Sequence, residues 1–217
     1  MNGMPVPPTN SYEPFYVDCG KWLVRTASVD DASERWASWL TDSEVSHFLN
    51  APPKAMKLAD LIAYTKSFDQ KSRMLLGIFE KVSNTLVGFI RFDIDLAQGR
   101  YLGSILIGEP EYRNKGVVFD ITEPCRVYLF EKRGMKTMVS TALSHNRAII
   151  YYMLKTGWKL DKTVKGHVKS QADGSMLDLC YFSITRDAWR AWRNADVPGR
   201  KRWRQGPTSA SPARSDN

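Results

Sequence analysis

The chain has 217 residues, of which 43% are apolar and 12% aromatic, and this composition is typical of a folded globular protein and excludes a disordered chain. No apolar run approaches the ~20 residues of a membrane-spanning helix, and the N-terminus has neither the basic nor the apolar region of a secretory signal. We therefore expect a cytoplasmic protein without a membrane partner. Its single domain would span 21–195, between an irregular arm at 1–20 and a basic tail without regular structure at 196–217.

The net charge of +8 is concentrated at the C-terminal end. Residues 185–217 carry eight of the 31 Lys and Arg residues but only three of the 23 Asp and Glu residues. The rest of the chain is only mildly basic, which disfavours nucleic acid as a partner except through the tail. Cys19, Cys125 and Cys180 lie far apart without C-x-x-C spacing, so we expect neither a disulfide framework nor a metal site.

The first half of the domain alternates strands and amphipathic helices. Trp36, Trp39 and Leu40 share a helical face, and Asp30 or Asp31 can cap the helix that carries them. Two later strands are joined by a Ser-Asn-Thr triplet, which predicts a hairpin. The elements expected are a strand at 22–26, the Trp-bearing helix, helices at 43–49 and 58–68, and strands at 74–80 and 86–95.

The second half begins with a strand at 101–107, which Gly108 and Pro110 end. A helix at 117–131 and a strand at 137–143 follow, and a strand–helix–strand crossover of this kind implies parallel pairing. Pro124 lies inside that helix, where it removes a hydrogen bond, so we expect a kink or a restarted helix. The remaining elements are a helix from Asn146 to Gly157, strands at 158–169 and 175–184 joined by an Asp-Gly turn, and a short helix carrying Trp.

The turn between the 101–107 strand and the following helix is suited to binding an anion. Gly116 allows close approach of the backbone, and the first N–H groups of the helix have no partner within it. Arg113 and Lys115 add positive charge. A pyrophosphate fits this description, and the alternative interpretation is a basic surface turn.

Two segments together resemble motifs of the GNAT superfamily of acyl-CoA N-acyltransferases. Arg113 and Gly116 match the first two fixed positions of its pyrophosphate loop, Arg/Gln-x-x-Gly-x-Gly/Ala, whereas Val118 stands where the family prefers Gly or Ala. Asn146, followed eleven residues later by Gly157 and an aromatic residue, resembles the second motif. The stretch SEVSHFLNAPPK is similar to the segment after the first helix in the ribosomal-protein N-acetyltransferase-like branch.

This resemblance implies an α/β (α+β) fold with a V-shaped cleft. Its central mixed, mostly antiparallel sheet would have about seven strands flanked by helices, and the cleft would open between the fourth and fifth strands. Backbone N–H groups around Leu106 and Ile107 would polarise the thioester carbonyl. The residues implied to bind acetyl-CoA, or another short acyl-CoA, as co-substrate are Ile105, Leu106, Ile107, Arg113, Asn114, Lys115, Gly116, Val117, Val118 and Asn146.

The proton donor for the departing thiolate is harder to assign. Many relatives carry a Tyr seven residues after the motif Asn, but here Met153 takes that position and Tyr152 stands one residue earlier. One residue is a rotation of ~100° on a helix, enough to turn a side chain from cleft to core. Tyr152 is therefore a candidate acid with core packing as its alternative, and Tyr151, Ser144 or a water could substitute.

Candidate acceptor groups lie on two other elements. Asp93 and Asp95 alternate with apolar residues on the 86–95 strand and could act as general bases or bind a cationic amine. The alternative interpretation is that both are solvated carboxylates on the protein surface. The resemblance places His47 and Phe48 at the border of the acceptor pocket, although a lone His beside Phe48 can equally be a packing residue.

Three functions follow from the resemblance. The first is an N-acyltransferase that moves an acetyl or other short acyl group from acyl-CoA to the primary amine of a small molecule by direct attack. The second is a protein N-terminal acetyltransferase, and the third a CoA-binding module without turnover, which the departures at Val118, Pro124 and Met153 favour. We expect the first function, because the segments at 43–57 and 159–178 would narrow the acceptor end of the cleft. The protein would be a monomer or a homodimer.

Overall fold

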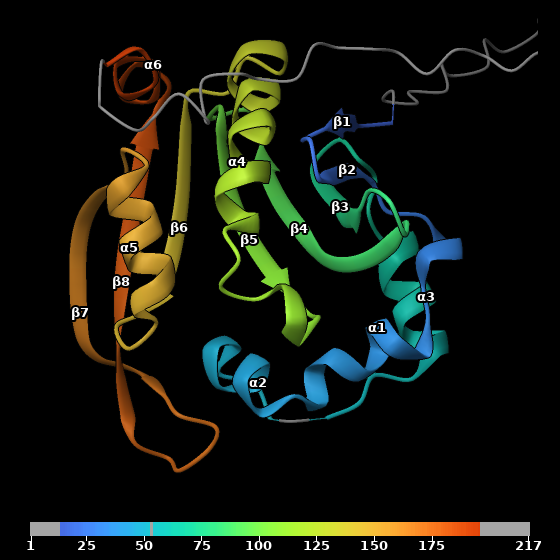
Figure 1. Ribbon diagram of the computed structural model, residues 1–217. Helices are drawn as coiled ribbons and strands as arrows, with labels where there is room; N and C mark the ends of the chain where they lie inside the picture. Colours follow the sequence, from blue (N-terminus) through green and yellow to red (C-terminus); the bar gives the residue numbers. More distant parts are fainter. Residues whose placement is uncertain (1–13, 53, 196–217) are drawn as a thin grey trace, which may run out of the picture.

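The computed structural model describes residues 14–52 and 54–195, which form an eight-stranded sheet flanked by helices (Figure 1). The strand order is β1-β2-β3-β4-β5-β6-β8-β7, and every neighbouring pair is antiparallel except β5 and β6. The strands are β1 (Tyr16–Asp18), β2 (Trp22–Thr26), β3 (Arg73–Glu80), β4 (Thr85–Asp95), β5 (Arg100–Ile107), β6 (Thr137–Leu143), β7 (Lys159–Lys169) and β8 (Met176–Thr185). The α-helices are α1 (Glu34–Ser38), α2 (Ser43–Leu49), α3 (Leu58–Lys66), α4 (Val117–Val127), α5 (Arg147–Lys155) and α6 (Arg186–Asn194).

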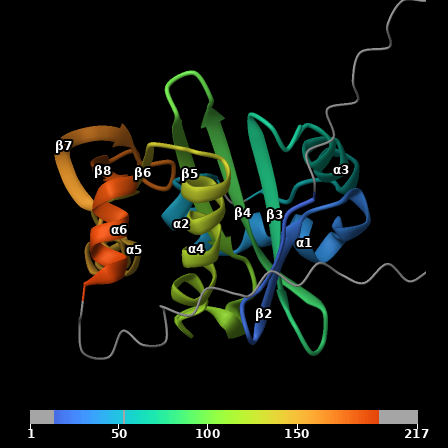
Figure 2. The ribbon, with the colours of Figure 1, turned by 90° about the horizontal axis from the view of Figure 1, so that it is seen from above.

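Period-two alternation on the central strands gives the sheet two apolar faces. On β4, Ile90 and Phe92 belong to the larger core with residues of α4, α5 and α6, whereas Phe89 packs with Trp36 and Trp39 in a second core. Seen from above, α1 and α3 lie at the β2–β3 end of the sheet, and α5 and α6 lie at the end with β7 and β8 (Figure 2). None of the helices in the described ranges is long and apolar enough to cross a membrane.

The functionally important feature of the sheet is the separation of β5 from β6. These strands pair in parallel at only three positions, the last being Leu102 with Val139, and diverge beyond them (Figure 1). Ser140 Oγ bridges part of the gap by donating a 3.1 Å hydrogen bond to the carbonyl oxygen of Gly103. The predicted V-shaped cleft is therefore present, between the fifth and sixth strands because of one additional N-terminal strand.

That additional strand is one of three differences from the sequence-based expectations. Tyr16–Asp18 pairs with β2 as β1, within the segment expected to be irregular, and buried Phe15 anchors it. Asp31 does not cap α1, because it forms an ion pair with Arg25 instead, and Ser33 is the N-cap. The arm at 1–13 and the tail at 196–217 lie outside the described residues.

The third difference concerns the proline in α4. Pro124 neither breaks nor restarts the helix, which continues to Val127. The regular hydrogen-bond pattern changes only afterwards, where Tyr128–Lys132 forms a wider π-helical turn. The missing N–H of Pro124 is thus accommodated within a continuous helix, whose apolar face packs on the sheet.

Candidate active site

The turn before α4 has the geometry of an anion-binding site. Gly116 is the N-cap of α4 with φ of +78°, a backbone conformation that favours glycine. No side chain caps this end of the helix, so the first amides, those of Val117 and Val118, remain available to a ligand. A Cβ at Gly116 would meet no atom within 4 Å, so the backbone is open on that side.

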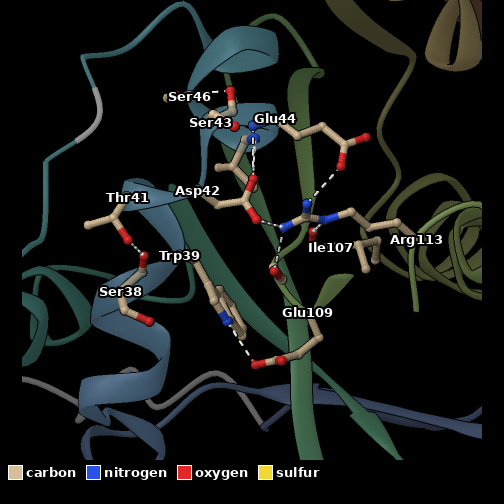
Figure 3. Close-up of polar contacts among 12 residues, drawn as sticks. Ser38, Trp39, Thr41, Asp42, Ser43, Glu44, Ser46, Ile107, Glu109 and Arg113 are labelled. Atoms are coloured by element: carbon tan, nitrogen blue, oxygen red, sulfur yellow. Dashed lines mark hydrogen bonds and ion pairs between the residues drawn. The ribbon is translucent and has the colours of Figure 1, made fainter. Parts of the chain in front are cut away.

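The side chain of Arg113 points away from this turn and clamps α2 to the end of β5 (Figure 3). Its guanidinium donates to the carbonyl oxygens of Ile107 (3.1 Å) and Gly108 (2.7 Å). It also forms ion pairs with Asp42 (3.1 Å) and Glu44 (2.8 Å). The hydrogen bond from Arg113 keeps the pKa of Asp42 below its usual value. The positive charge expected to meet a phosphate is therefore already neutralised by two carboxylates.

A cavity of about 890 Å³ runs from the α4 N-terminus into the gap between β5 and β6. It is of the size that binds small molecules and cofactors. Among the predicted cofactor residues, only Lys115 is absent from its lining, which includes Ile105, Leu106, Ile107, Arg113, Asn114, Gly116, Val117, Val118 and Asn146. Cys125 also lines it, but burial raises the pKa of its thiol well above the ordinary value and makes it unsuited to nucleophilic attack.

Helix α2 spans the open end of this cavity and contacts both arms of the split sheet. Its C-cap Asn50 donates to the carbonyl oxygen of Lys169 and accepts from the amide of Gln171, each at 2.9 Å. The His47 ring lies 4.3 Å from that of His145, at the turn after β6. Of the two predicted acceptor residues, Phe48 lines the cavity, whereas His47 packs against His145.

The predicted acid, Tyr152, lines the cavity but has a small exposed fraction of 6%. Its hydroxyl donates to Thr122 Oγ1 and accepts a 3.1 Å hydrogen bond from Arg126 Nη2. Both interpretations made from the sequence thus meet here, since the residue is packed and also borders the cavity. The neighbouring Tyr151 is 58% exposed.

The predicted bases, Asp93 and Asp95, do not line the cavity. Asp93 forms ion pairs with Arg91 (2.8 Å) and Arg73 (3.6 Å), and Asp95 accepts from the amide of Gln98. Because side chains alternate along a strand, both lie on the face of β4 opposite to Phe92, which does line the cavity. The structure does not bring them together with the loop, and their role as bases stays a prediction.

Comparison with known proteins identifies the fold and the family. The profile of the family described as "Acetyltransferase (GNAT) domain" matches residues 22–159. The chain belongs to the GNAT acetyltransferase family. Members of this family use acetyl-CoA as the acyl donor, and the position of the cavity agrees with such a co-substrate. No curated protein matches the sequence significantly.

Solved structures show the same GNAT fold at low sequence identity. A GNAT-family acetyltransferase from Bacillus anthracis has a TM-score of 0.67 at 18% identity, covering 80% of this chain and 99% of that one. Spermidine N-acetyltransferase from Vibrio cholerae, solved with CoA and spermine, has a TM-score of 0.68 at 14% identity, covering 78% and 98%. Ribosomal-protein-S5-alanine acetyltransferase from Vibrio fischeri has a TM-score of 0.65 at 13% identity, covering 81% and 98%.

Sequence reasoning missed several polar residues of the cavity, above all Arg126. It is 2% exposed and lines the cavity from α4, although a charged residue on an amphipathic helix is normally expected on the solvent face. Its sequence signal is weak, because Arg126 stands between Cys125 and Val127 without a recognisable motif. The described residues contain no group of three or more His, Cys, Asp or Glu side chains placed to hold a metal ion.

Proposed function

We propose that this GNAT-family chain transfers an acetyl or other short acyl group from acyl-CoA to the primary amine of a small molecule. The observation that carries the proposal is the cavity that joins the uncapped α4 N-terminus to the gap between β5 and β6. The helix end supplies N–H donors for a pyrophosphate. The edge of β5 beyond Leu102, which no described strand covers on the β6 side, supplies main-chain groups for an extended pantetheine arm.

The residues of the chain would act mainly by positioning and by polarising the acyl carbonyl. Backbone N–H groups near Leu106 and Ile107 are candidates to stabilise the oxyanion that develops as the amine attacks. Tyr152 remains the candidate acid because it lines the cavity. Direct attack on the thioester needs no enzyme nucleophile, in agreement with the protonated state of Cys125.

The acceptor end favours a small amine over a protein N-terminus. Helix α2 reaches from the end of β5 to the β7–β8 hairpin through Arg113 and Asn50, and this narrows the opening through which a peptide would have to enter. The lining near α2 is largely apolar, with Val45, Phe48, Leu49, Val168 and Leu179. Such a lining fits an acceptor molecule whose amine is attached to an apolar group.

The two acceptor types represented among the structural neighbours give a direct alternative. One is named for spermidine, a polyamine, and the other for an alanine of ribosomal protein S5. A polyamine would need free carboxylates, but Asp42 and Glu44 are already paired with Arg113. These ion pairs favour an acceptor with a single amine.

The test is a screen of acceptors with acetyl-CoA, with release of the CoA thiol as readout and CoA binding measured separately by calorimetry. We expect turnover with small apolar amines and little with spermidine or with peptides that begin with Ala or Ser. Efficient acetylation of such peptides, with small amines inert, would favour the N-terminal acetyltransferase. CoA binding without turnover for any amine or peptide would favour the binding module.

A further inference from the structure

The cavity offers no free proton acceptor to an incoming ammonium ion. A base that takes a proton at neutral pH is usually a His or a carboxylate. Among the described residues that line the cavity there is no His, and Glu44 is the only Asp or Glu. An oxygen of Glu44 lies 2.8 Å from Arg113 Nη1, and Asp42, just outside the lining, shares the same guanidinium at 3.1 Å. The carboxylates closest to the opening are therefore already used in ion pairs.

Carboxylates of the neighbouring strands are engaged as well. On β4, Asp93 is shared between Arg91, at 2.8 Å, and Arg73, at 3.6 Å. On β8, Asp178 accepts a 2.9 Å hydrogen bond from a main-chain amide. Two guanidiniums beside one carboxylate leave no excess negative charge on β4 that would attract an ammonium ion.

The three histidines of the chain do not line the cavity. The rings of His47 and His145 pack on each other with centroids 4.3 Å apart, and His145 Nε2 is buried, out of reach of an acceptor. On β7, His167 Nε2 lies 3.1 Å from the hydroxyl of Tyr181. Only His47, which is exposed on α2, is accessible beside the opening.

The accessible side chains at the opening are apolar. Phe48 and Leu49 on α2 are 36% and 46% exposed, and both line the cavity. Val168 and Leu179 line it from the β7–β8 hairpin. Contact with an apolar or aromatic group removes such surfaces from water and is favourable. An ammonium ion placed among them would lose its hydration without gaining a counter-charge, which costs free energy.

These apolar side chains lie at the level of the reacting carbonyl. The last pair of β5 and β6 is Leu102 with Val139. Leu106 and Leu143 stand equally far beyond that pair, so they lie at the same level on the two arms of the V. Leu179 pairs with Leu143 across β6 and β8. An amine at a thioester carbonyl near Leu106 would therefore have its substituent between β8 and α2.

We propose that the acceptor is an arylamine, an amine that is already uncharged at neutral pH, with its ring against Phe48, Leu49 and Leu179. This inference deepens the proposed function and rests on it, because it requires acyl-CoA in the same cleft. An alkylamine resembles the side chain of Lys, whose pKa is about 10.4, and so enters as an ammonium ion. In an arylamine the nitrogen lone pair is delocalised into the ring, so the nitrogen does not carry the additional proton.

Starting from a neutral amine, the acyl transfer needs no net proton acceptor. The nitrogen lone pair forms a bond to the thioester carbonyl carbon, the carbon–sulfur bond breaks, and the sulfur leaves with the bonding electron pair. The nitrogen loses one proton and the sulfur gains one. The products are an N-aryl amide and the CoA thiol. An ammonium acceptor would have to lose one more proton, for which the lining described above offers no free His or carboxylate.

The test compares aniline with benzylamine, which carries the same ring on one additional methylene group. KM for each acceptor is measured with the full-length chain at saturating acetyl-CoA, from about pH 6 to about pH 9, with release of the CoA thiol as readout. We expect KM for aniline to be independent of pH and at least about tenfold lower than KM for benzylamine at neutral pH. KM for benzylamine should fall about tenfold per pH unit as its neutral fraction rises.

Three variants complete the design. Phe48→Ala should raise KM for aniline by about fivefold without changing the affinity for CoA, because it removes apolar contact surface. Leu154→Ala is the matched control, since Leu154 is 54% exposed on α5 and does not line the cavity. His47→Gln removes the accessible imidazole and should leave the pH dependence of KM for benzylamine as it is in the wild-type chain.

Several outcomes would overturn the inference while leaving the proposed function intact. They are a KM for benzylamine that does not depend on pH, a pH dependence that His47→Gln changes, and turnover of other amines but not of aniline. The first two would show that the site binds the ammonium form or supplies a base. Absence of turnover with every amine, although CoA binds, would overturn the proposed function and the inference together.

Discussion

At the scale of single residues, Gly116 is the position where the backbone itself would meet the ligand. Gly116→Asp should lower the affinity for CoA by about tenfold or more, since the new carboxylate would occupy the open space and repel a pyrophosphate. Calorimetric titration with CoA gives the measurement. Gly134→Asp is a matched control, because Gly134 also has positive φ and open space around its Cβ position. Unchanged CoA affinity in Gly116→Asp would remove the loop from the binding site.

Tyr152 is the second single residue to test, because its roles as proton donor and as packing residue predict different kinetics. Tyr152→Phe removes hydrogen bonds with Thr122 and Arg126, which should lower the free energy of unfolding by about 1–3 kcal/mol. If the hydroxyl also protonates the leaving thiolate, kcat should fall by about a hundredfold with KM for acyl-CoA nearly constant. The control variant, Tyr16→Phe, removes an exposed hydroxyl on β1, away from the cavity, and should change neither quantity. A loss of stability with normal kcat would assign Tyr152 to packing alone.

At the scale of elements, α2 depends on a clamp that lies far from it in sequence. Arg113→Gln removes the ion pairs to Asp42 and Glu44, so hydrogen exchange at 43–50 should become faster while the sheet stays protected. CoA affinity should change little, because the guanidinium points away from the loop. Arg190→Gln breaks an exposed ion pair with Glu131 and serves as the control. A large loss of CoA affinity in Arg113→Gln would instead show that this side chain reaches the pyrophosphate.

The same clamp should respond to acid. The pKa of Asp42 is lowered in the folded chain, so its contribution to stability is fully present above the unfolded value of about 3.9. It is lost as the pH falls through the lower folded value. Protection of the 43–50 segment, corrected for intrinsic exchange rates, should therefore stay constant from neutral pH to about pH 4 and decrease below it. In Asp42→Asn this acid-dependent step should be smaller.

At the scale of the whole molecule, the GNAT domain should not need the basic tail. Truncation after Ala195 removes the segment at 196–217, whose only large apolar residue is Trp203. The melting temperature should change by less than about 2 °C and the affinity for CoA should stay the same, because so little apolar surface is involved. Thermal unfolding of the two chains gives the comparison. A large fall in melting temperature would show that the tail packs on the domain.

The sequence by itself determined the main elements and their order, apart from β1. The alternation of Ile90, Phe92 and Ile94, the capping residue Asn146 and the glycines at 116 and 157 are local signals, and each depends on neighbours within a few residues. The strands at 22–26 and 137–143 and the helix at 43–49 were predicted with their observed bounds for the same reason. Family motifs then placed the anion-binding turn.

Only the tertiary structure decided where the charged and buried polar groups go. Arg113 lies within the predicted turn, but its partners Asp42 and Glu44 come from the start of a helix about 70 residues earlier. Tyr101 on β5, Arg126 on α4 and Trp158 just before β7 line one cavity, and no local pattern brings these residues together. The physical reason is that hydrogen bonds and ion pairs depend on distances of a few ångströms between distant segments. These distances exist only after the sheet has closed and the helices have packed on it.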